Sequence, residues 1–268
     1  MEQINSTANP KIKLAVSLQQ KKYRDKYNLF LLEGLRNAET AANAGAKIDM
    51  CFCTPEIVQN ERAQKFLASL TCPIYEVSEN IFSKISDTKS PQGLMLVVQK
   101  NDCSLNDLTI LPKSCLLILD RLQDPGNIGT LIRTADALGA AAIICLNGTA
   151  DVFSPKVVRS AMGSLFSLPF AVKVNEVDLL SFCHKHDLKL YAAALDRQAK
   201  IVWNTDFTCG CGIILGNEAN GVSAELLNNS TNKIYIPMTG SAESLNVATA
   251  GAMITYERHR QCFKITSL

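Results

Sequence analysis

The sequence predicts an α/β protein of two domains, the second of which is a mostly parallel sheet with helices on both faces. Short apolar runs alternate with helix-like stretches, and the run from Cys115 to Leu119 is apolar at every position. Such a strand is typical of the centre of a parallel sheet, because helices cover both of its faces. A polar stretch at 100–104 separates two alternating series. We therefore place a smaller N-terminal α/β domain at residues 1–100, a linker at 101–112 and a C-terminal domain at 113–268.

The N-terminal domain begins with a basic stretch. Residues 1 to about 28 predict one basic helix, with Asn9-Pro10 at its start. The apolar runs and turns that follow predict strands at 30–34, 50–53, 74–77 and 94–99, and helices at 35–44, 63–70 and 79–85.

The C-terminal domain continues the alternation from the strand at 115–119. Further strands are predicted at 141–146, 170–174, 188–194, 212–215 and 233–236, and helices at 127–138, 155–162, 177–186, 222–228 and 246–260. Ligands of such sheets bind beyond the carboxyl ends of the strands, so the segments that follow the strands are the candidates for a site.

Composition narrows the class of protein. The chain is 47% apolar and 19% charged, which is typical of a folded protein. No apolar run reaches the ~20 residues that span a membrane, and we expect no signal peptide. The ten cysteines lack zinc-finger spacing and indicate reduced structural thiols. We therefore expect a cytoplasmic protein with no metal site.

Positive charge is concentrated at the N-terminus, although the net charge of the whole chain is only +2. Residues 1–26 hold six basic and two acidic side chains. A basic arm of this kind can bind the phosphates of a nucleic acid in any sequence. A solvated helix face is the alternative interpretation, and it is the commoner one for a short basic run.

The first segment with candidate chemistry runs from Asp120 to Ala135, directly after the central strand. Pro125-Gly126 predicts a turn, and Asn127 is placed to cap the helix that follows. Arg133 lies six residues further on, or about 1.7 helical turns. An arginine in this position can bind phosphate through two hydrogen bonds, and the alternative is a surface ion pair with Asp136 or Asp120.

The second and third segments also follow predicted strands. In the second, the strand ends at Gly216, where a ligand can approach the backbone, and Glu218 precedes the next helix. The third runs from Ile236 to Val247 and contains Pro237, a polar loop and Asn246 at the start of the last helix. An ordinary helix cap and turn is the alternative interpretation of this third segment.

The glycine-rich turn at 125–129 matches neither of two common nucleotide-binding motifs. Gly126 and Gly129 do not form the G-x-G-x-x-G fingerprint of dinucleotide-binding domains, although Asp151 stands about 20 residues further on. No G-x-x-x-x-G-K-[ST] segment occurs, which excludes a P-loop. A nicotinamide-dependent dehydrogenase therefore stays open only as a disfavoured alternative.

Together, the three segments resemble the motifs of the SpoU (TrmH) family of RNA ribose 2′-O-methyltransferases, whose catalytic domain has the knotted SPOUT fold. The resemblance extends from Asp120 to about Glu257. The stretches Phe30–Gly34 and Ser90–Leu94 are similar to the ribosomal-protein-L30-like substrate-binding domain of the same family. The resemblance implies a deep C-terminal trefoil knot, which few proteins contain.

The resemblance also implies a cofactor, S-adenosylmethionine, held in a bent shape by the knot. The residues that match cofactor contacts are Gly216, Ile236 and Leu245, mainly through main-chain groups, with Met238 and Ser244 as neighbours. The small residues Ala248, Ala250, Gly251 and Ala252 then allow tight packing of the knot and of a homodimer formed by the catalytic domain.

The residues that match the catalytic positions of the family are Arg133, Asn127, Glu218, Ser244 and Asn246. Arg133 matches the arginine that assists deprotonation of the ribose hydroxyl. Because a guanidinium is a poor base at its ordinary pKa, we favour phosphate binding and orientation of the hydroxyl as its role. Asn127 matches the asparagine that places the ribose or Arg133, and Glu218, Ser244 and Asn246 match polar residues that line the site.

The resemblance predicts methyl transfer to RNA, with ribosomal RNA favoured over transfer RNA because of the L30-like domain and the basic arm. A transfer-RNA 2′-O-methyltransferase is the first alternative. A non-catalytic RNA-binding protein with the same fold is the second, although such a protein would have no need of the five polar residues named above.

Overall fold

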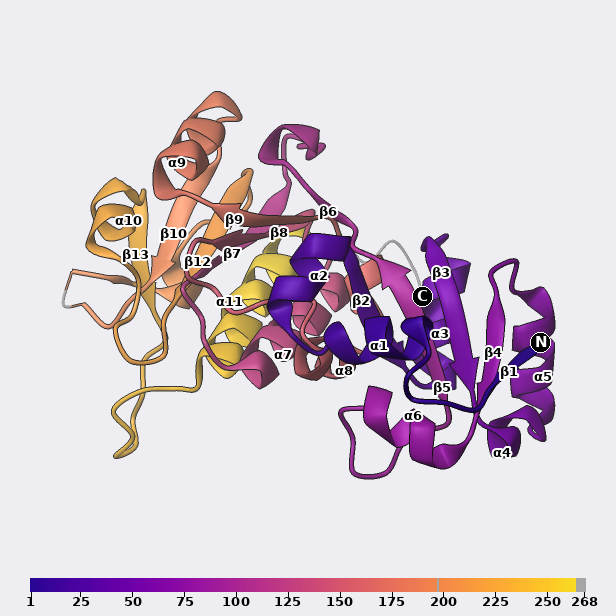
Figure 1. The fold of residues 1–268 in the computed structure, drawn as a ribbon. Coiled ribbons are helices and arrows are strands. Elements are labelled where there is room, and N and C mark those ends of the chain that lie inside the picture. Colours follow the sequence, from indigo (N-terminus) through magenta and orange to yellow (C-terminus); the bar gives the residue numbers. More distant parts are fainter. Residues whose placement is uncertain (197, 264–268) are drawn as a thin grey trace. The chain divides into compact units, whose positions relative to one another are not determined.

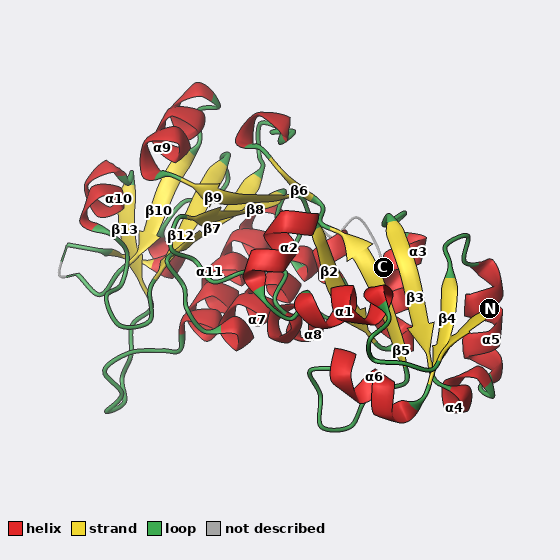
Figure 2. Cartoon of the chain, viewed as in Figure 1, coloured by secondary structure: helices red, strands yellow, loops and turns green. Residues whose placement is uncertain are grey.

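The computed structural model describes residues 1–196 and 198–263, which divide into two compact units. The first unit contains Met1–Asn101 and Asp151–Ser167, and the second contains Asp102–Ala150 and the described residues from Leu168 onward. Figure 1 follows the chain through the elements of both units, and Figure 2 distinguishes helices from strands. No described helix is long and apolar enough to cross a membrane.

The first unit is built on a five-stranded mixed sheet in the order β1-β4-β3-β5-β2. β1, β4 and β3 run parallel, and β5 is antiparallel to both β3 and β2. The strands are β1 (Glu2–Ile4), β2 (Leu29–Glu33), β3 (Ile48–Cys53), β4 (Ile74–Val77) and β5 (Leu94–Gln99). The helices are α1 (Pro10–Ser17), α2 (Lys21–Tyr27), α3 (Leu35–Asn43), α4 (Pro55–Val58), α5 (Glu61–Ser69), α6 (Glu79–Ile85) and α8 (Pro155–Ala161), with a 3₁₀ helix at Ser164–Phe166.

The prediction of one basic helix over residues 1–28 is wrong, because this stretch forms β1, α1 and α2. Asn9 does cap α1, since its Oδ1 accepts a hydrogen bond from the N–H of Lys11 at 2.9 Å. The helix ends after Ser17, and the fully buried Leu18 is its C-cap. The buried Arg24 of α2 donates to the carbonyls of Leu18 and Gln19, and these bonds hold the turn between the two helices.

The segment 151–167 follows the central strand in the sequence but packs in the first unit. The ring of Phe30 lies 5.2 Å from Phe153 and 6.1 Å from Phe166, between centroids. The Arg24 Nη2 atom lies 2.7 Å from the Asp151 Oδ2 atom, and both side chains are nearly buried. These contacts join residues more than 100 positions apart, so the periodicity that defined the boundary at 113 contains no sign of them.

The second unit is an eight-stranded sheet in the order β11-β13-β10-β12-β7-β8-β9-β6, and every neighbouring pair is parallel. Its strands are β6 (Asp102–Cys103), β7 (Cys115–Asp120), β8 (Ala142–Leu146), β9 (Phe170–Val174), β10 (Lys189–Ala193), β11 (Lys200–Ile201), β12 (Cys211–Gly216) and β13 (Asn232–Tyr235). Its helices are α7 (Pro125–Ala137), α9 (Glu176–Lys185), α10 (Ala224–Asn229) and α11 (Val247–Cys262), with 3₁₀ helices at Leu105–Asp107 and Val202–Asn204.

The predicted linker, 101–112, is partly structured. Its residues Asp102 and Cys103 pair with β9 as an edge strand, and Leu108 is buried in the core of the second unit. Two-residue strands such as β6 and β11 contain too few positions to show a period of two, and the sequence therefore gave no indication of either.

Helices cover both faces of the eight-stranded sheet, as Figure 2 shows. Leu116 and Ile118 of β7 point to the face that α9 and α10 cover with Leu179 and Leu226. α7 and α11 cover the opposite face, where Gly251 of α11 lies against Leu131 and Leu215. The strand β7 is buried at every position, as its continuous apolar run predicts.

Candidate active site

The three motif segments meet at the carboxyl ends of neighbouring strands in the second unit. β7 and β12 run side by side, and their last residues, Asp120 and Gly216, are paired in the register. A pocket opens beyond these ends, between β12 and the start of α11. It is lined by the predicted residues Gly216, Glu218, Ile236, Met238, Ser244, Leu245 and Asn246.

A line of hydrogen bonds connects the three segments. The Asn127 amide donates from Nδ2 to Glu218 Oε1 at 3.1 Å, and its Oδ1 accepts from Asn246 Nδ2 at 2.9 Å. Asn246 in turn caps α11, because its Oδ1 accepts from the N–H groups of Ala248 and Thr249. Asn127 is therefore fixed from both sides, and Asn246 is at once a helix cap and a residue of the site.

Glu218 binds the start of α7 to the loop after β12. Its carboxylate accepts hydrogen bonds from the backbone N–H groups of Gln123 and Asp124, at 3.1 Å each, as well as from Asn127. Burial works against ionisation of Glu218, but these donors outweigh it and lower its pKa from the ordinary value of 4.5. Its oxygens are occupied by the chain itself, which is typical of a group that orients others.

Gly216 is required by the fold as well as by the pocket. A Cβ atom on this residue would lie 2.1 Å from the backbone of Gly221 and Val222, a distance that no side chain tolerates. The backbone that approaches Gly216 closely is thus that of the following loop, and Gly216 also faces the pocket.

Asp120 and Arg121 form an ion pair that the sequence did not single out. Asp120 is completely buried, and its carboxylate accepts from Arg121 Nε at 2.8 Å and from the N–H of Ser223 at 2.7 Å. The backbone of Arg121 lies in the left-handed region, with φ at 58°, which costs free energy for a residue of this size. The Arg121 carbonyl accepts from Asn217 Nδ2 at 2.8 Å, so one residue joins the loops after β7 and β12.

Arg133 lies on α7 with an exposed side chain. The predicted alternative, an ion pair with Asp136 or Asp120, is not formed among the described residues, since Asp120 pairs with Arg121. Arg133 is not among the residues that line the pocket. Its guanidinium therefore has no partner in the described part of this chain.

The backbone of the third segment suits a ligand that binds main-chain groups. Residues 236–245 form no hydrogen bond with any other described residue, although Ile236, Met238 and Leu245 are half-buried beside the pocket. Their N–H and C=O groups are thus available to a polar ligand, while the Ile236 and Leu245 side chains add apolar contact. This combination fits S-adenosylmethionine, which has both an adenine ring and charged groups.

Asp151 has a different role from the acidic residue of a dinucleotide-binding domain. Its Oδ2 atom is paired with the buried Arg24 in the first unit, and its side chain is 10% exposed. A carboxylate that is buried and paired in this way does not present itself to a ribose, which removes the remaining support for a dehydrogenase.

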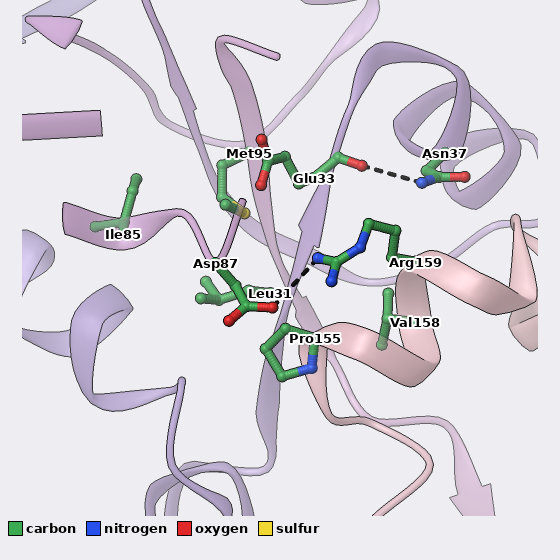
Figure 3. A pocket seen from close by; sticks show the side chains of 9 residues that line it. All are labelled: Leu31, Glu33, Asn37, Ile85, Asp87, Met95, Pro155, Val158 and Arg159. Atoms are coloured by element: carbon green, nitrogen blue, oxygen red, sulfur yellow. Dashed lines mark hydrogen bonds and ion pairs between the residues drawn. The ribbon is translucent and has the colours of Figure 1, made fainter. Parts of the chain in front are cut away.

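A smaller pocket in the first unit lies between β2, α6 and α8 (Figure 3). Its polar groups bind one another: Arg159 Nη1 lies 3.2 Å from Asp87 Oδ2, and Asn37 donates to the carbonyl of Glu33. The Glu33 carboxylate accepts from Ser86 and from the N–H of Gln92. These partners give the pocket a structural role in holding the loop 86–93.

All ten cysteines lie in the described part of the chain, and none of them forms a disulfide there. Within residues 1–196 and 198–263, no group of three or more His, Cys, Asp or Glu side chains is arranged to hold a metal ion.

Comparisons with known proteins agree with this geometry. The SpoU rRNA Methylase family matches residues 114–256, and the MRM3-like substrate binding domain matches residues 9–96. The chain is 36% identical over 259 residues to the 23S rRNA (guanosine(2553)-2′-O)-methyltransferase RlmP of Bacillus subtilis, covering 96% of this chain and 98% of that protein.

Two solved structures extend the comparison. An AdoMet-bound rRNA methyltransferase from Sinorhizobium meliloti is similar with a TM-score of 0.89 and 31% identity, over 98% of this chain and 99% of that one. The SpoU methyltransferase AviRb from Streptomyces viridochromogenes, solved in complex with AdoMet, has a TM-score of 0.88 and 28% identity, over 94% and 98%. The present chain belongs to the SpoU rRNA Methylase family.

Proposed function

We propose that this protein transfers a methyl group from S-adenosylmethionine to a ribose 2′-hydroxyl of ribosomal RNA. The observation that carries the proposal is the hydrogen-bonded line Glu218–Asn127–Asn246, which joins the three motif segments at the mouth of one pocket. The RNA class follows from the name of the similar Bacillus subtilis enzyme, which acts on 23S rRNA.

The cofactor is held in the pocket beyond β12. Gly216, Ile236 and Leu245 line this pocket and would hold the cofactor mainly through main-chain groups, with Met238 and Ser244 beside them. When bound, S-adenosylmethionine supplies an electrophilic methyl group on a sulfonium.

Arg133 binds a phosphate of the RNA and orients the 2′-hydroxyl for attack. Its guanidinium acts as a hydrogen-bond donor and as a positive charge, not as a base. Because this exposed guanidinium has no partner among the described residues, its five N–H donors are left for the substrate. Asn127 and Asn246 place the ribose at the end of the hydrogen-bonded line, with Glu218 as their anchor.

The C-terminal segment 236–262 passes through a loop of the same chain and forms a trefoil knot. The support is that β13 and the segment after it reach the same strand ends as β7 and β12, which come earlier in the sequence. α11 then returns to pack against α7 and β12, with Gly251 at the closest approach.

The catalytic domain forms a homodimer, and the protein acts in the cytoplasm, where ribosomal RNA and reduced thiols occur together. The support for a dimer is the apolar surface of α11, where Met253 is 47% and Tyr256 is 58% exposed.

The experiment measures transfer of labelled methyl groups to unmodified 23S rRNA transcribed in vitro. The Arg133→Ala variant is expected to lose roughly 100-fold in transfer and to bind S-adenosylmethionine like the wild type in calorimetry. Arg133→Lys keeps the positive charge but cannot form bidentate hydrogen bonds to a phosphate. Its rate of methyl transfer should therefore lie between those of Arg133→Ala and the wild type. Full transfer by Arg133→Ala would overturn the role of this residue. A wild-type protein that bound no S-adenosylmethionine would point instead to a non-catalytic RNA-binding protein.

A further inference from the structure

The first unit presents a surface of lysine and tyrosine side chains that its own fold does not use. It comprises Lys13 of α1, Lys22, Tyr23, Lys26 and Tyr27 of α2, and Lys84 of α6; we call it the lysine–tyrosine face. Lys13, Tyr23 and Lys84 line one shallow groove. The groove lies where α1 and α6 pack against each other. The Gln19 side chain donates to the carbonyl of Lys84 at 3.0 Å and fixes the two helices to each other.

The four lysines of this face form no ion pair with any residue that the structure describes. Two other lysines of the same unit do have acidic partners: Lys11 lies 3.7 Å from Glu2, and Lys100 lies 3.0 Å from Asp25. Lys13, Lys22, Lys26 and Lys84 are all exposed. The face therefore holds a positive charge that the protein leaves uncompensated, as expected of a surface for a polyanion.

Two aromatic rings lie among these charges. The rings of Tyr23 and Tyr27 are nearly parallel, at 12°, with centroids 6.3 Å apart, and Tyr27 is 43% exposed. The ammonium groups of Lys22 and Lys26 lie 5.8 and 5.1 Å from the Tyr23 and Tyr27 centroids. Exposed tyrosine rings beside lysines can stack with bases while the lysines contact phosphates.

The face is rigid because the opposite side of α2 is fixed. Arg24 points inward, is 3% exposed, and bonds both to Asp151 and to the carbonyls of Leu18 and Gln19. Helical spacing then places residues 22, 23, 26 and 27 together on the outer side of α2. A platform fixed in this way loses little conformational entropy on binding.

We propose that the lysine–tyrosine face binds an unpaired segment of the substrate RNA, with phosphates on the lysines and a base stacked on Tyr27. The inference deepens the proposed function, on which it rests, by naming the surface of the first unit that holds the RNA outside the methylated nucleotide. An unpaired segment is required because bases in a duplex stack on each other and offer no open ring face to a side chain.

The first test removes three of the charges and compares salt dependence. In the variant Lys13→Gln, Lys22→Gln, Lys26→Gln, the affinity for a fluorescein-labelled RNA hairpin with an eight-nucleotide loop is expected to fall. The slope of log affinity against log salt should decrease by about 2, since each phosphate contact to a single strand contributes about 0.7. The matched control is Lys47→Gln, Lys65→Gln, Lys185→Gln, three exposed lysines elsewhere, which should keep the wild-type slope. Equal slopes for the two triple variants would overturn the proposal.

The second test isolates stacking. Tyr27→Ala is expected to weaken binding of the looped hairpin at least roughly fivefold, whereas Tyr27→Phe retains the ring and binds within about twofold of the wild type. A blunt RNA duplex of the same length should bind equally to all three proteins. Loss of duplex binding in Tyr27→Ala, or equal hairpin binding by Tyr27→Ala and the wild type, would contradict a stacked base.

Failure of this inference can be told apart from failure of the proposed function. If the lysine and tyrosine variants bind RNA like the wild type while the wild type methylates 23S rRNA, the face is excluded and the enzyme assignment stands. If the wild type transfers no methyl group but the face binds the hairpin as described, the RNA surface stands and the reaction is excluded. S-adenosylmethionine affinity should be unchanged in every variant of the face, because the cofactor pocket lies in the second unit.

Discussion

Asp120 is a fully buried carboxylate whose charge is balanced by Arg121 and by the N–H of Ser223. We predict that Asp120→Asn weakens S-adenosylmethionine binding at least roughly tenfold and lowers the free energy of unfolding by about 1–3 kcal/mol. The reason is that the amide leaves Arg121 without its counter-charge and releases the loop that forms the wall of the pocket. Calorimetry and thermal unfolding measure the two effects. A variant with wild-type affinity and stability would show that the pair does not hold the loop.

Glu218 provides a prediction about pH. Its pKa is lower in the folded protein than the ordinary value of 4.5, so its contribution to stability is present above that value and is lost as the pH falls through the folded pKa. Glu218→Gln should therefore unfold at a lower temperature than the wild type at pH 7. The difference should shrink as the pH is lowered below 4.5 and the carboxylate of the wild type becomes protonated. A difference that stayed constant across this range would mean that the charge of Glu218 does not matter to the fold.

Single residues also mark the limit of what the sequence could predict about the site. Glu218 follows β12 and Asn246 caps α11, and these local signals identified both residues. The prediction that Asn127 caps its helix is wrong: Asp124 is the cap, and its carboxylate accepts from the N–H of Asn127, which lies within the first turn of α7. The bonds that link Asn127 to Glu218 and to Asn246 join positions 91 and 119 residues apart, which no local pattern describes. Arg121 was not singled out, because neither its positive φ nor its buried partner has a signature in the sequence.

At the scale of elements, the packing of α11 depends on a residue without a side chain. A Cβ atom at Gly251 would lie 2.5 Å from both Leu131 of α7 and Leu215 of β12. Gly251→Ala should therefore destabilise the protein by about 1–3 kcal/mol, although alanine favours a helix by up to about 1 kcal/mol over glycine. Chemical denaturation measures the change. Thr249→Ala, on the exposed side of the same helix, is the control and should be neutral. A Gly251→Ala variant more stable than the wild type would contradict the close approach.

Elements with a long and regular pattern were predicted well, and those defined by tertiary contacts were not. The strands β5 and β9 and the helix α6 match their predicted ranges. The predicted basic helix is instead divided after Ser17, and the bonds from Arg24 to the carbonyls of Leu18 and Gln19, which hold the turn, depend on the fold. Likewise, α8 lies in the first unit because aromatic rings of 151–167 pack on Phe30, a contact without a local cause.

For the molecule as a whole, the apolar surface of α11 leads to a prediction about assembly. Met253 and Tyr256 are three residues apart and so lie on the same side of α11, and both are exposed in the single chain. If two catalytic domains associate through this surface, a charge placed on it must be buried without a partner, at a cost of several kcal/mol. The double variant Met253→Glu, Tyr256→Glu should then sediment as a monomer at concentrations where the wild type is a dimer. Val177→Glu replaces an exposed apolar residue on α9 and serves as the control, which should remain dimeric. A double variant that sedimented like the wild type would place the dimer contact elsewhere. Because Val247 and Ala250 of the same helix line the cofactor pocket, loss of the dimer should also weaken S-adenosylmethionine binding.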